Sequence, residues 1–237
     1  MNNNFATEII KKDLNVVLTC IFIVLSAVSG GSIIFSLLKL NGDFRVDNIY
    51  AMYAYISKLA VMFLPIIIWG MEFKNNTINQ LRLSKRNLTS IYVYKFVAYL
   101  IDLTVIMLIS FFEVLSYGAI AKVDISTNEL FGNMMLAYFL YGFFYFGIGC
   151  CFVFTLKDMT KSIIGILILY FCSGMTCNMI ARMGASIGNI VKYIPFSYAE
   201  DAFYFACFNM KQVISILIFA ILTNIIAVVL LKKRGEM

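Results

Sequence analysis

Three ionisable residues lie within long apolar stretches of this sequence: Lys58, Asp102 and Glu113. An ionisable group at the centre of a membrane helix costs roughly 2.5–3.5 kcal/mol, so each is expected to face protein or water and not lipid. Lys95 is expected on the same side of a helix as Asp102 and Glu113, because spacings of seven and eleven residues are close to whole turns. This side is expected to face the interior of a helical bundle or a dimer interface.

Lys58 and Asp102 are predicted to form an ion pair. Counted from the loop that would join their helices, the two residues lie at nearly the same depth. The alternative is that the Lys58 side chain extends to the membrane surface while Asp102 is protonated. Glu113 would lie nearer the outer face, where it either contacts a cationic substrate or belongs to a solvated rim.

The residue types that are missing exclude several kinds of chemistry. The chain has no histidine, which excludes the Ser-His-Asp triad, the HExxH zinc site and His-dependent intramembrane proteases. Its six cysteines form no CxxC pair, and we interpret them as small apolar residues. No GxxxxGK[ST] loop is present to hold the phosphates and Mg²⁺ of ATP. The chain itself is therefore expected to be no enzyme and to bind no cofactor.

The elements that must position these charges are transmembrane helices. Hydrophobic residues make up 62% of the 237 residues and charged residues only 14%, which is too apolar for a soluble domain. A membrane-spanning helix takes about 20 apolar residues. Six stretches qualify: 16–40, 49–71, 91–118, 130–156, 162–180 and 212–231. We predict an all-α membrane protein with six transmembrane helices, forming one domain over residues 1–237.

The basic residues predict the orientation of the chain in the membrane. With the N-terminus inside, twelve Lys and Arg residues fall on the inner side and five on the outer side, which also has six acidic residues. Because basic residues are enriched in cytoplasmic loops, both termini are expected in the cytoplasm. The net charge of +6 is then explained by topology, and no nucleic-acid partner is expected.

Two connections between the predicted spans have distinct patterns. In the inner loop, Thr77 and Gln80 fit a capping box, which predicts a short amphipathic helix after the second span. From periodicity alone, this helix either only orients the hairpin or docks onto a soluble motor subunit. In the outer connection, residues 182–211, a proline precedes an aromatic and acidic stretch. This pattern predicts a short interfacial or re-entrant helix.

The inner loop resembles the signature of type-2 ABC exporter permeases. In that family an acidic-aromatic pair ends the second helix, a Thr begins the coupling helix, and a Lys enters the third helix eighteen residues after the Thr. The matching residues here are Glu72, Phe73, Thr77, Leu81 and Lys95. The middle of the loop departs from the family's usual proline and Ser/Thr-Arg pair, which leaves the subfamily open.

The resemblance implies a set of residues that couple the chain to an ATPase subunit. They are Glu72, Phe73, Thr77, Ile78, Leu81, Lys85 and Arg86. It also implies a complex of two ATPase copies, which would bind ATP and Mg²⁺, with a second permease subunit that is identical or paralogous. In size and layout the chain looks like permeases of lantibiotic-immunity and bacitracin-type peptide exporters, which confer antibiotic resistance on bacteria.

We therefore expect a permease subunit in a bacterial cell membrane that moves an amphipathic antimicrobial or toxin peptide out of the membrane or the cell. Two alternatives stay open: an ABC permease for a lipid-like substrate, and a non-transporting sensor or assembly partner that binds an envelope component through residues 182–211. The exporter predicts that Leu81→Asp abolishes function, whereas the sensor predicts that the inner loop tolerates substitution.

Overall fold

The computed structural model describes residues 3–14, 46–79, 87–122 and 125–233, together with scattered positions between 20 and 35. Within these ranges the chain is helical and has no β-strand. Five of the described helices are long and apolar enough to cross a membrane. The all-α, membrane-type architecture predicted from composition is thus confirmed. The first predicted span, 16–40, lies largely outside the described residues.

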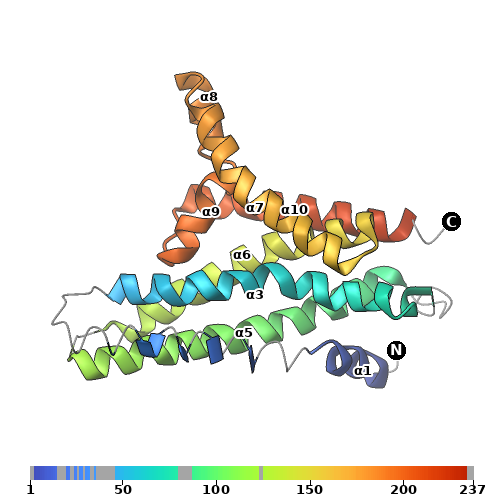
Figure 1. Ribbon diagram of the computed structural model, residues 1–237, viewed down its shortest axis with the longest axis horizontal. Helices are drawn as coiled ribbons and strands as arrows, with labels where there is room; N and C mark the ends of the chain where they lie inside the picture. The colour runs from blue at the N-terminus through green and yellow to red at the C-terminus, as the bar shows by residue number, and fades with distance from the viewer. Residues whose placement is uncertain are drawn as a thin grey trace.

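The long helices alternate in direction along the chain (Figure 1). They are α3 (Val46–Lys74), α5 (Leu88–Ala121), α6 (Thr127–Leu156), α7 (Met159–Ala181) and α10 (Met210–Lys233). The second to sixth predicted spans fall within them. The 34 residues of α5 form a helix of about 51 Å at 1.5 Å per residue, longer than the hydrocarbon thickness of about 30 Å. The ends of α5 therefore extend beyond the apolar layer.

Helix α6 is central, because it packs against α3, α5 and α10. The points of close approach are three glycines: Gly142, Gly147 and Gly149. A Cβ on the first would lie 2.4 Å from Leu103 of α5, on the second 2.4 Å from Thr223 of α10, and on the third 3.1 Å from Pro65 of α3. Small residues let helix backbones approach in this way.

Pro65 lies inside α3 and has no backbone N–H, so the carbonyl of Val61 lacks its partner within the helix. The hydroxyl of Tyr99, from α5, donates to this carbonyl at 3.0 Å and lies 3.2 Å from the carbonyl of Gly142 in α6. The Val61 carbonyl, which would be costly to leave without a hydrogen bond in an apolar interior, therefore has a donor. The same side chain ties α5 to its two neighbours.

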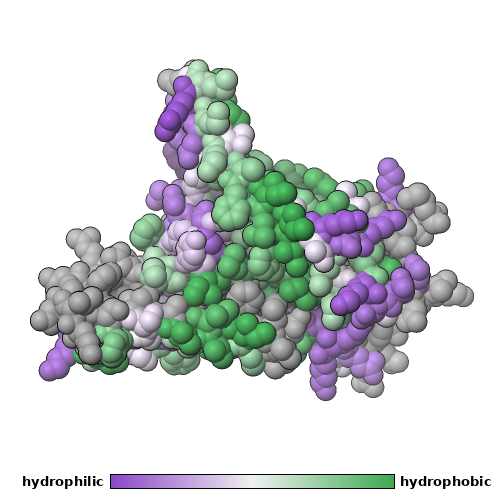
Figure 2. Space-filling model, in the orientation of Figure 1, coloured by the Kyte–Doolittle hydropathy of each residue, from purple (hydrophilic) through white to green (hydrophobic). Residues whose placement is uncertain are grey.

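One end of the bundle gathers α1 (Asn3–Asp13), the end of α3, the α6–α7 turn and the end of α10 (Figure 1). We call it the basic end after its lysines: Lys11, Lys12, Lys74, Lys157, Lys161, Lys232 and Lys233. Figure 2 shows hydrophobic residues over the middle of the bundle and hydrophilic residues gathered toward this end. The α6–α7 turn is tight, because Asp158 caps α7 by accepting a bond from the backbone of Lys161 at 2.8 Å.

The outer connection contains two short helices, α8 (Ala185–Val191) and α9 (Pro195–Tyr204). Helix α8 stands away from the bundle, whereas α9 folds back and packs against α3, α6, α7 and α10 (Figure 1). Pro195 occupies the first turn of α9, where a missing N–H costs no helical bond. The connection thus contains short helices, and whether either is interfacial or re-entrant stays a prediction.

Candidate functional site

The ammonium of Lys95 lies in a buried group of charges at the basic end. It donates to both carboxylate oxygens of Asp13, at 2.8 and 2.7 Å, and to Oε1 of Glu72 at 3.0 Å. It also lies 3.4 Å from the carbonyl of Ile68 and 5.1 Å from the ring centroid of Trp69. The three charged side chains are at most 5% exposed. Together with Lys12 and Thr77, we call these three residues the Lys95 cluster.

Three helices position the Lys95 cluster. Lys95 lies two turns into α5, and Asn87 fixes the start of this helix by accepting a bond from the backbone of Thr89. Glu72 lies in the last turn of α3, and Asp13 ends α1, which packs against α5. The cluster therefore joins α1 to the α3–α5 hairpin.

The charges of the Lys95 cluster balance. Lys12, whose side chain is largely exposed, donates to Oε1 of Glu72 at 2.9 Å, so that two lysines face two carboxylates. Burial raises the pKa of the Asp13 carboxyl, and the attraction of Lys95 offsets only part of that rise. Because both carboxylates share one buried ammonium, loss of Lys95 would leave buried charge without compensation.

The first residues of the inner loop are part of this cluster. The hydroxyl of Thr77 donates to the carboxylate of Glu72, which in turn accepts from Lys95. Three residues of the pattern that resembles the exporter permeases are thus in direct contact. Their contact is a structural fact about this chain, and the role in coupling stays a prediction.

The other predicted coupling residues are described only in part. Phe73 packs against Phe154 of α6, with ring centroids 6.4 Å apart, and Ile78 is buried. Leu81, Lys85 and Arg86 lie outside the described residues. The described half of the predicted coupling segment is therefore anchored to the bundle.

A second buried lysine, Lys58, lies midway along α3. Its ammonium donates to Oε1 of Glu200 at 2.7 Å and to the hydroxyls of Tyr170 and Tyr204. Both hydroxyls donate in turn to Glu200. Tyr170 belongs to α7, and the other two partners belong to α9. We call these four residues the Lys58 cluster.

The pairing with Glu200 corrects the predicted Lys58–Asp102 ion pair. Glu200 follows Lys58 by 142 positions and reaches it because α9 folds back against α3, which the sequence pattern did not predict. The alternative of an extended Lys58 is wrong as well, since Lys58 is 2% exposed. Burial raises the pKa of the Glu200 carboxyl, but the bonds from Lys58 and the two tyrosines outweigh burial and hold this pKa below its ordinary value.

Aromatic rings surround the Lys58 ammonium. Nζ lies 4.1 Å from the ring centroid of Tyr55, 4.6 Å from that of Tyr170 and 4.7 Å from that of Tyr204. These distances are within the range of cation–π attraction. The side chain of Glu200 is 38% exposed, whereas that of Lys58 is 3% exposed. The carboxylate and the two phenol hydroxyls thus bind one ammonium group, and in this structure that group belongs to Lys58.

The polar side of α5 faces protein, as predicted. Lys95 and Asp102 are buried, and Glu113 is half-buried. In the part of the chain that the structure describes, Oε2 of Glu113 is enclosed without a hydrogen-bond partner. Lys95 and Glu113 do not form one site, because Lys95 is held by Asp13 and Glu72 at the basic end.

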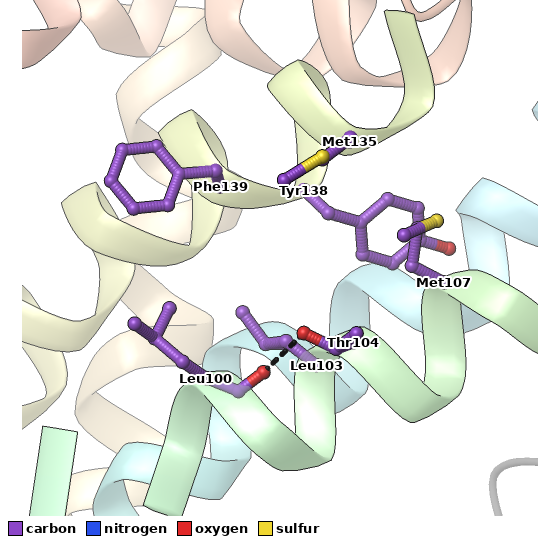
Figure 3. Close-up of a pocket in the computed structure, with 7 residues that line it drawn as sticks. All are labelled: Leu100, Leu103, Thr104, Met107, Met135, Tyr138 and Phe139. Carbon is purple, nitrogen blue, oxygen red and sulfur yellow. Dashed lines mark hydrogen bonds between the residues drawn. The ribbon is translucent and has the colours of Figure 1, made fainter. Parts of the chain in front are cut away.

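A groove of about 200 Å³ lies between α5 and α6 (Figure 3). Its lining residues are Leu100, Leu103, Thr104, Met107, Met135, Tyr138 and Phe139. The hydroxyl of Thr104 donates to the carbonyl of Leu100 at 2.8 Å, and that of Tyr138 donates to Ser57 at 2.7 Å. Both hydroxyl hydrogens are thus used within the protein. The groove can accommodate an apolar chain, and it presents no group suited to catalysis.

Sequence reasoning missed Asp13, Tyr170, Glu200 and Tyr204. One signal was available for two of them: Glu200 and Tyr204 are four residues apart, which places them on one face of a helix. Asp13 directly follows Lys11 and Lys12, and a charged run of this kind is typical of a solvent-exposed segment, so the sequence gives no sign that Asp13 is buried. No pattern around Tyr170 distinguishes it from the other tyrosines of the chain.

Among the described residues, no group of three or more His, Cys, Asp or Glu side chains could hold a metal ion. The two lysine clusters are therefore the arrangements with the most specific geometry. No protein-family model matches this chain, and no curated protein sequence matches it. The functional proposals are therefore argued from the geometry of the two lysine clusters.

Proposed function

We propose that this chain is the membrane-spanning permease subunit of an ABC exporter, driven by a separate ATPase subunit. The observation that supports this proposal is the contact among Glu72, Thr77 and Lys95. In the resemblance to type-2 ABC exporter permeases, these three residues are matched by their type and their spacing in the sequence. Their contact offers a physical reason for this spacing, because it anchors the start of the loop to α3 and α5.

The Lys95 cluster would transmit movement of the loop into the membrane. A displacement of Thr77 acts on Glu72, and Glu72 is bound to Lys95 and through it to Asp13. Separating these charges in a buried setting is costly, so the start of the loop, α1 and the basic ends of α3 and α5 move together. Closure of the two ATPase copies would push this unit and reorient α3.

The proposed orientation places the basic end in the cytoplasm of a bacterial cell. This end has most of the lysines found at or beside the ends of the described helices, as expected from the positive-inside rule. The proposed complex contains two permease subunits, surrounded by membrane lipid, and exports an amphipathic peptide. An apolar surface with few charged positions suits such a substrate better than a small polar solute.

Affinity purification from native membranes in mild detergent, followed by mass spectrometry, tests the proposal. We expect an ATPase in stoichiometric amount, lost from the Leu81→Asp variant. Ile190→Asp is the matched control, because Ile190 is an exposed residue of α8, far from the basic end (Figure 1). A second permease in the eluate would distinguish a heterodimer from a homodimer. Absence of any ATPase in several detergents would contradict the proposal and favour the sensor or assembly role.

A further inference from the structure

The groups around the Lys58 ammonium come from two separable parts of the fold. Lys58 and Tyr55 belong to α3, whereas Tyr170, Glu200 and Tyr204 belong to α7 and α9. Helix α9 is a ten-residue helix within the α7–α10 connection. Of the five candidate spans, α7 has the smallest share of buried residues in the described structure. The carboxylate and the two hydroxyls that bind Lys58 therefore belong to elements other than α3, and one of these elements is the least buried span.

The two sides of the cluster differ in exposure. Lys58 reaches Glu200 from the buried side, where its own side chain is 3% exposed, while 38% of the Glu200 side chain is exposed. The ring of Tyr55 is also exposed, at 59%. A ligand can thus approach the same carboxylate from the open side without passing through the bundle.

The position around Glu200 that faces the two tyrosines holds one ammonium group, that of Lys58. Glu200 is the carboxylate bound to Lys58, and the other partners of Nζ are phenol hydroxyls and rings. Two ammonium groups held against one another away from bulk water repel strongly. The Lys58 ammonium already lies between the two tyrosine hydroxyls and Glu200, so an external ammonium group can take this position only after Lys58 has left it.

We propose that Tyr170, Glu200 and Tyr204 form a binding site for a primary ammonium group of the transported molecule, which Lys58 fills as an internal competitor in the described conformation. The identity of the ligand as cargo rests on the proposed function, whereas the site itself does not. When α7 and α9 separate from α3, the ligand's ammonium group enters between the tyrosines. When they close again, Lys58 displaces it and promotes release.

Direct binding of a small probe tests the site. The full-length chain is purified in detergent, and n-butylammonium binding is measured by calorimetry, with n-butanol as the uncharged probe of similar shape. We expect Lys58→Ala to bind n-butylammonium at least tenfold more tightly than wild type, because the competitor is gone. The gain should disappear in Lys58→Ala/Glu200→Gln and should not occur with n-butanol.

A result with equal binding of both probes by folded Lys58→Ala would overturn the site and leave the cluster as a structural contact only. Should Lys58→Ala not fold, Lys58→Met replaces it, because methionine fills similar apolar volume without charge. If neither folds, purification in the presence of n-butylammonium supplies the readout. Recovery of folded protein with n-butylammonium but not with n-butanol supports the site, and no recovery contradicts it.

Two arms distinguish the sources of the ammonium group. In the first, wild type binds a lysine-containing amphipathic peptide and the same peptide with acetylated lysines, and Glu200→Gln is the control. In the second, wild type is placed in nanodiscs containing phosphatidylethanolamine or phosphatidylcholine. A preference for the free lysine identifies peptides, a stabilisation specific to ethanolamine identifies lipids, and no preference in either arm overturns the inference about cargo.

These measurements use the purified chain without an ATPase, so the two proposals fail separately. Ammonium-selective binding in a chain that never co-purifies with an ATPase would support the site and contradict the exporter. An ATPase that co-purifies with a chain lacking ammonium selectivity would contradict only the site.

Discussion

The ammonium of Lys95 lies 2.7 Å from a carboxylate oxygen of Asp13, although 82 positions of sequence separate the two residues. This contact attaches the N-terminal helix α1 to the membrane helices by buried charge. Burying Ile9 adds an apolar contact, but most described side chains of α1 are exposed or half-buried. The position of α1 therefore depends on the Lys95 cluster.

Replacing Lys95 by methionine is expected to destabilise the protein by about 3–5 kcal/mol, because it leaves Asp13 buried without its cation and Glu72 with only the largely exposed Lys12. Thermal unfolding in detergent provides the measurement. The triple variant Lys95→Met/Asp13→Asn/Glu72→Gln should regain most of the lost stability, since no unpaired charge is left. Lys74→Met, an exposed lysine at the same end, should unfold like wild type. If Lys95→Met and Lys74→Met unfold alike, the cluster contributes little to stability.

The contribution of Glu200 is expected to depend on pH. Its pKa in the folded chain lies below the ordinary value of 4.5, so the carboxylate stabilises the fold above pH 4.5 and loses this effect as pH falls through the folded pKa. The difference in melting temperature between wild type and Glu200→Gln should be constant from neutral pH to 4.5 and shrink below it. A difference that grows on acidification would contradict this assignment.

The pKa of Asp13 is shifted in the opposite direction from that of Glu200, so its effect on stability has the opposite pH dependence. Its pKa is raised from 3.8, so ionisation of this carboxyl lowers stability as pH rises through the interval above 3.8. Relative to Asp13→Asn, wild type should therefore become more stable on acidification through that interval. The opposite signs allow the effect of Asp13 to be distinguished from that of Glu200 in one set of unfolding curves.

Gly147→Ala is expected to destabilise the α6–α10 contact by about 1–3 kcal/mol, as overpacking usually does. A Cβ here would lie 2.4 Å from the hydroxyl of Thr223, which can rotate, and 2.9 Å from the backbone nitrogen of Asn224, which cannot. The control is Gly132→Ala in the same helix, where a Cβ meets nothing within 4 Å. That change should be neutral or stabilise by up to about 1 kcal/mol through helix propensity. Equal melting temperatures of the two variants would argue against close packing at Gly147.

Cysteine labelling tests the proposed orientation. In a variant whose six native cysteines are replaced, Lys74→Cys and Lys157→Cys should react only from the cytoplasmic side. Lys122→Cys, at the end of α5 opposite to the basic end, should react with an impermeant maleimide added to intact cells. Labelling of positions 74 and 122 from the same side would contradict a membrane-spanning α5.

Composition and hydropathy were enough to predict the helical architecture, because an apolar run of about 20 residues has few other stable solutions. The glycines of α6 are a further signal in the sequence, because small residues within a span indicate close neighbouring helices. The contact among Glu72, Thr77 and Lys95 was within reach too, because a helical hairpin brings the two ends of its loop together.

The partner of Lys58 could not be predicted in this way. Depth along two adjacent helices favoured Asp102, but depth does not show which face a third element will cover. Glu200 lies in a connection whose pattern allowed either an interfacial or a re-entrant helix. The position of α9 against the bundle depends on residues far away in the chain: Phe203 stacks on Tyr141 of α6, and Tyr198 donates to the carbonyl of Gln212 in α10. Long-range pairing of this kind has no local signal.

The separation of the paired residues along the chain sets an order for biogenesis. Glu72 and Lys95 are 23 positions apart, so they can meet as soon as α5 has left the ribosome and entered the membrane. Lys58 has to wait for Glu200, which is synthesised 142 residues later, about 7–30 s at roughly 5–20 residues per second. During that interval α3 has to be accommodated with an unmatched lysine near its middle, which is costly in lipid. Synthesis of α9 is thus the step that supplies the partner of Lys58 and completes the packing around α3. A nascent chain halted before Glu200 would keep Lys58 unpaired, and we expect such a chain to be a substrate for quality-control proteases.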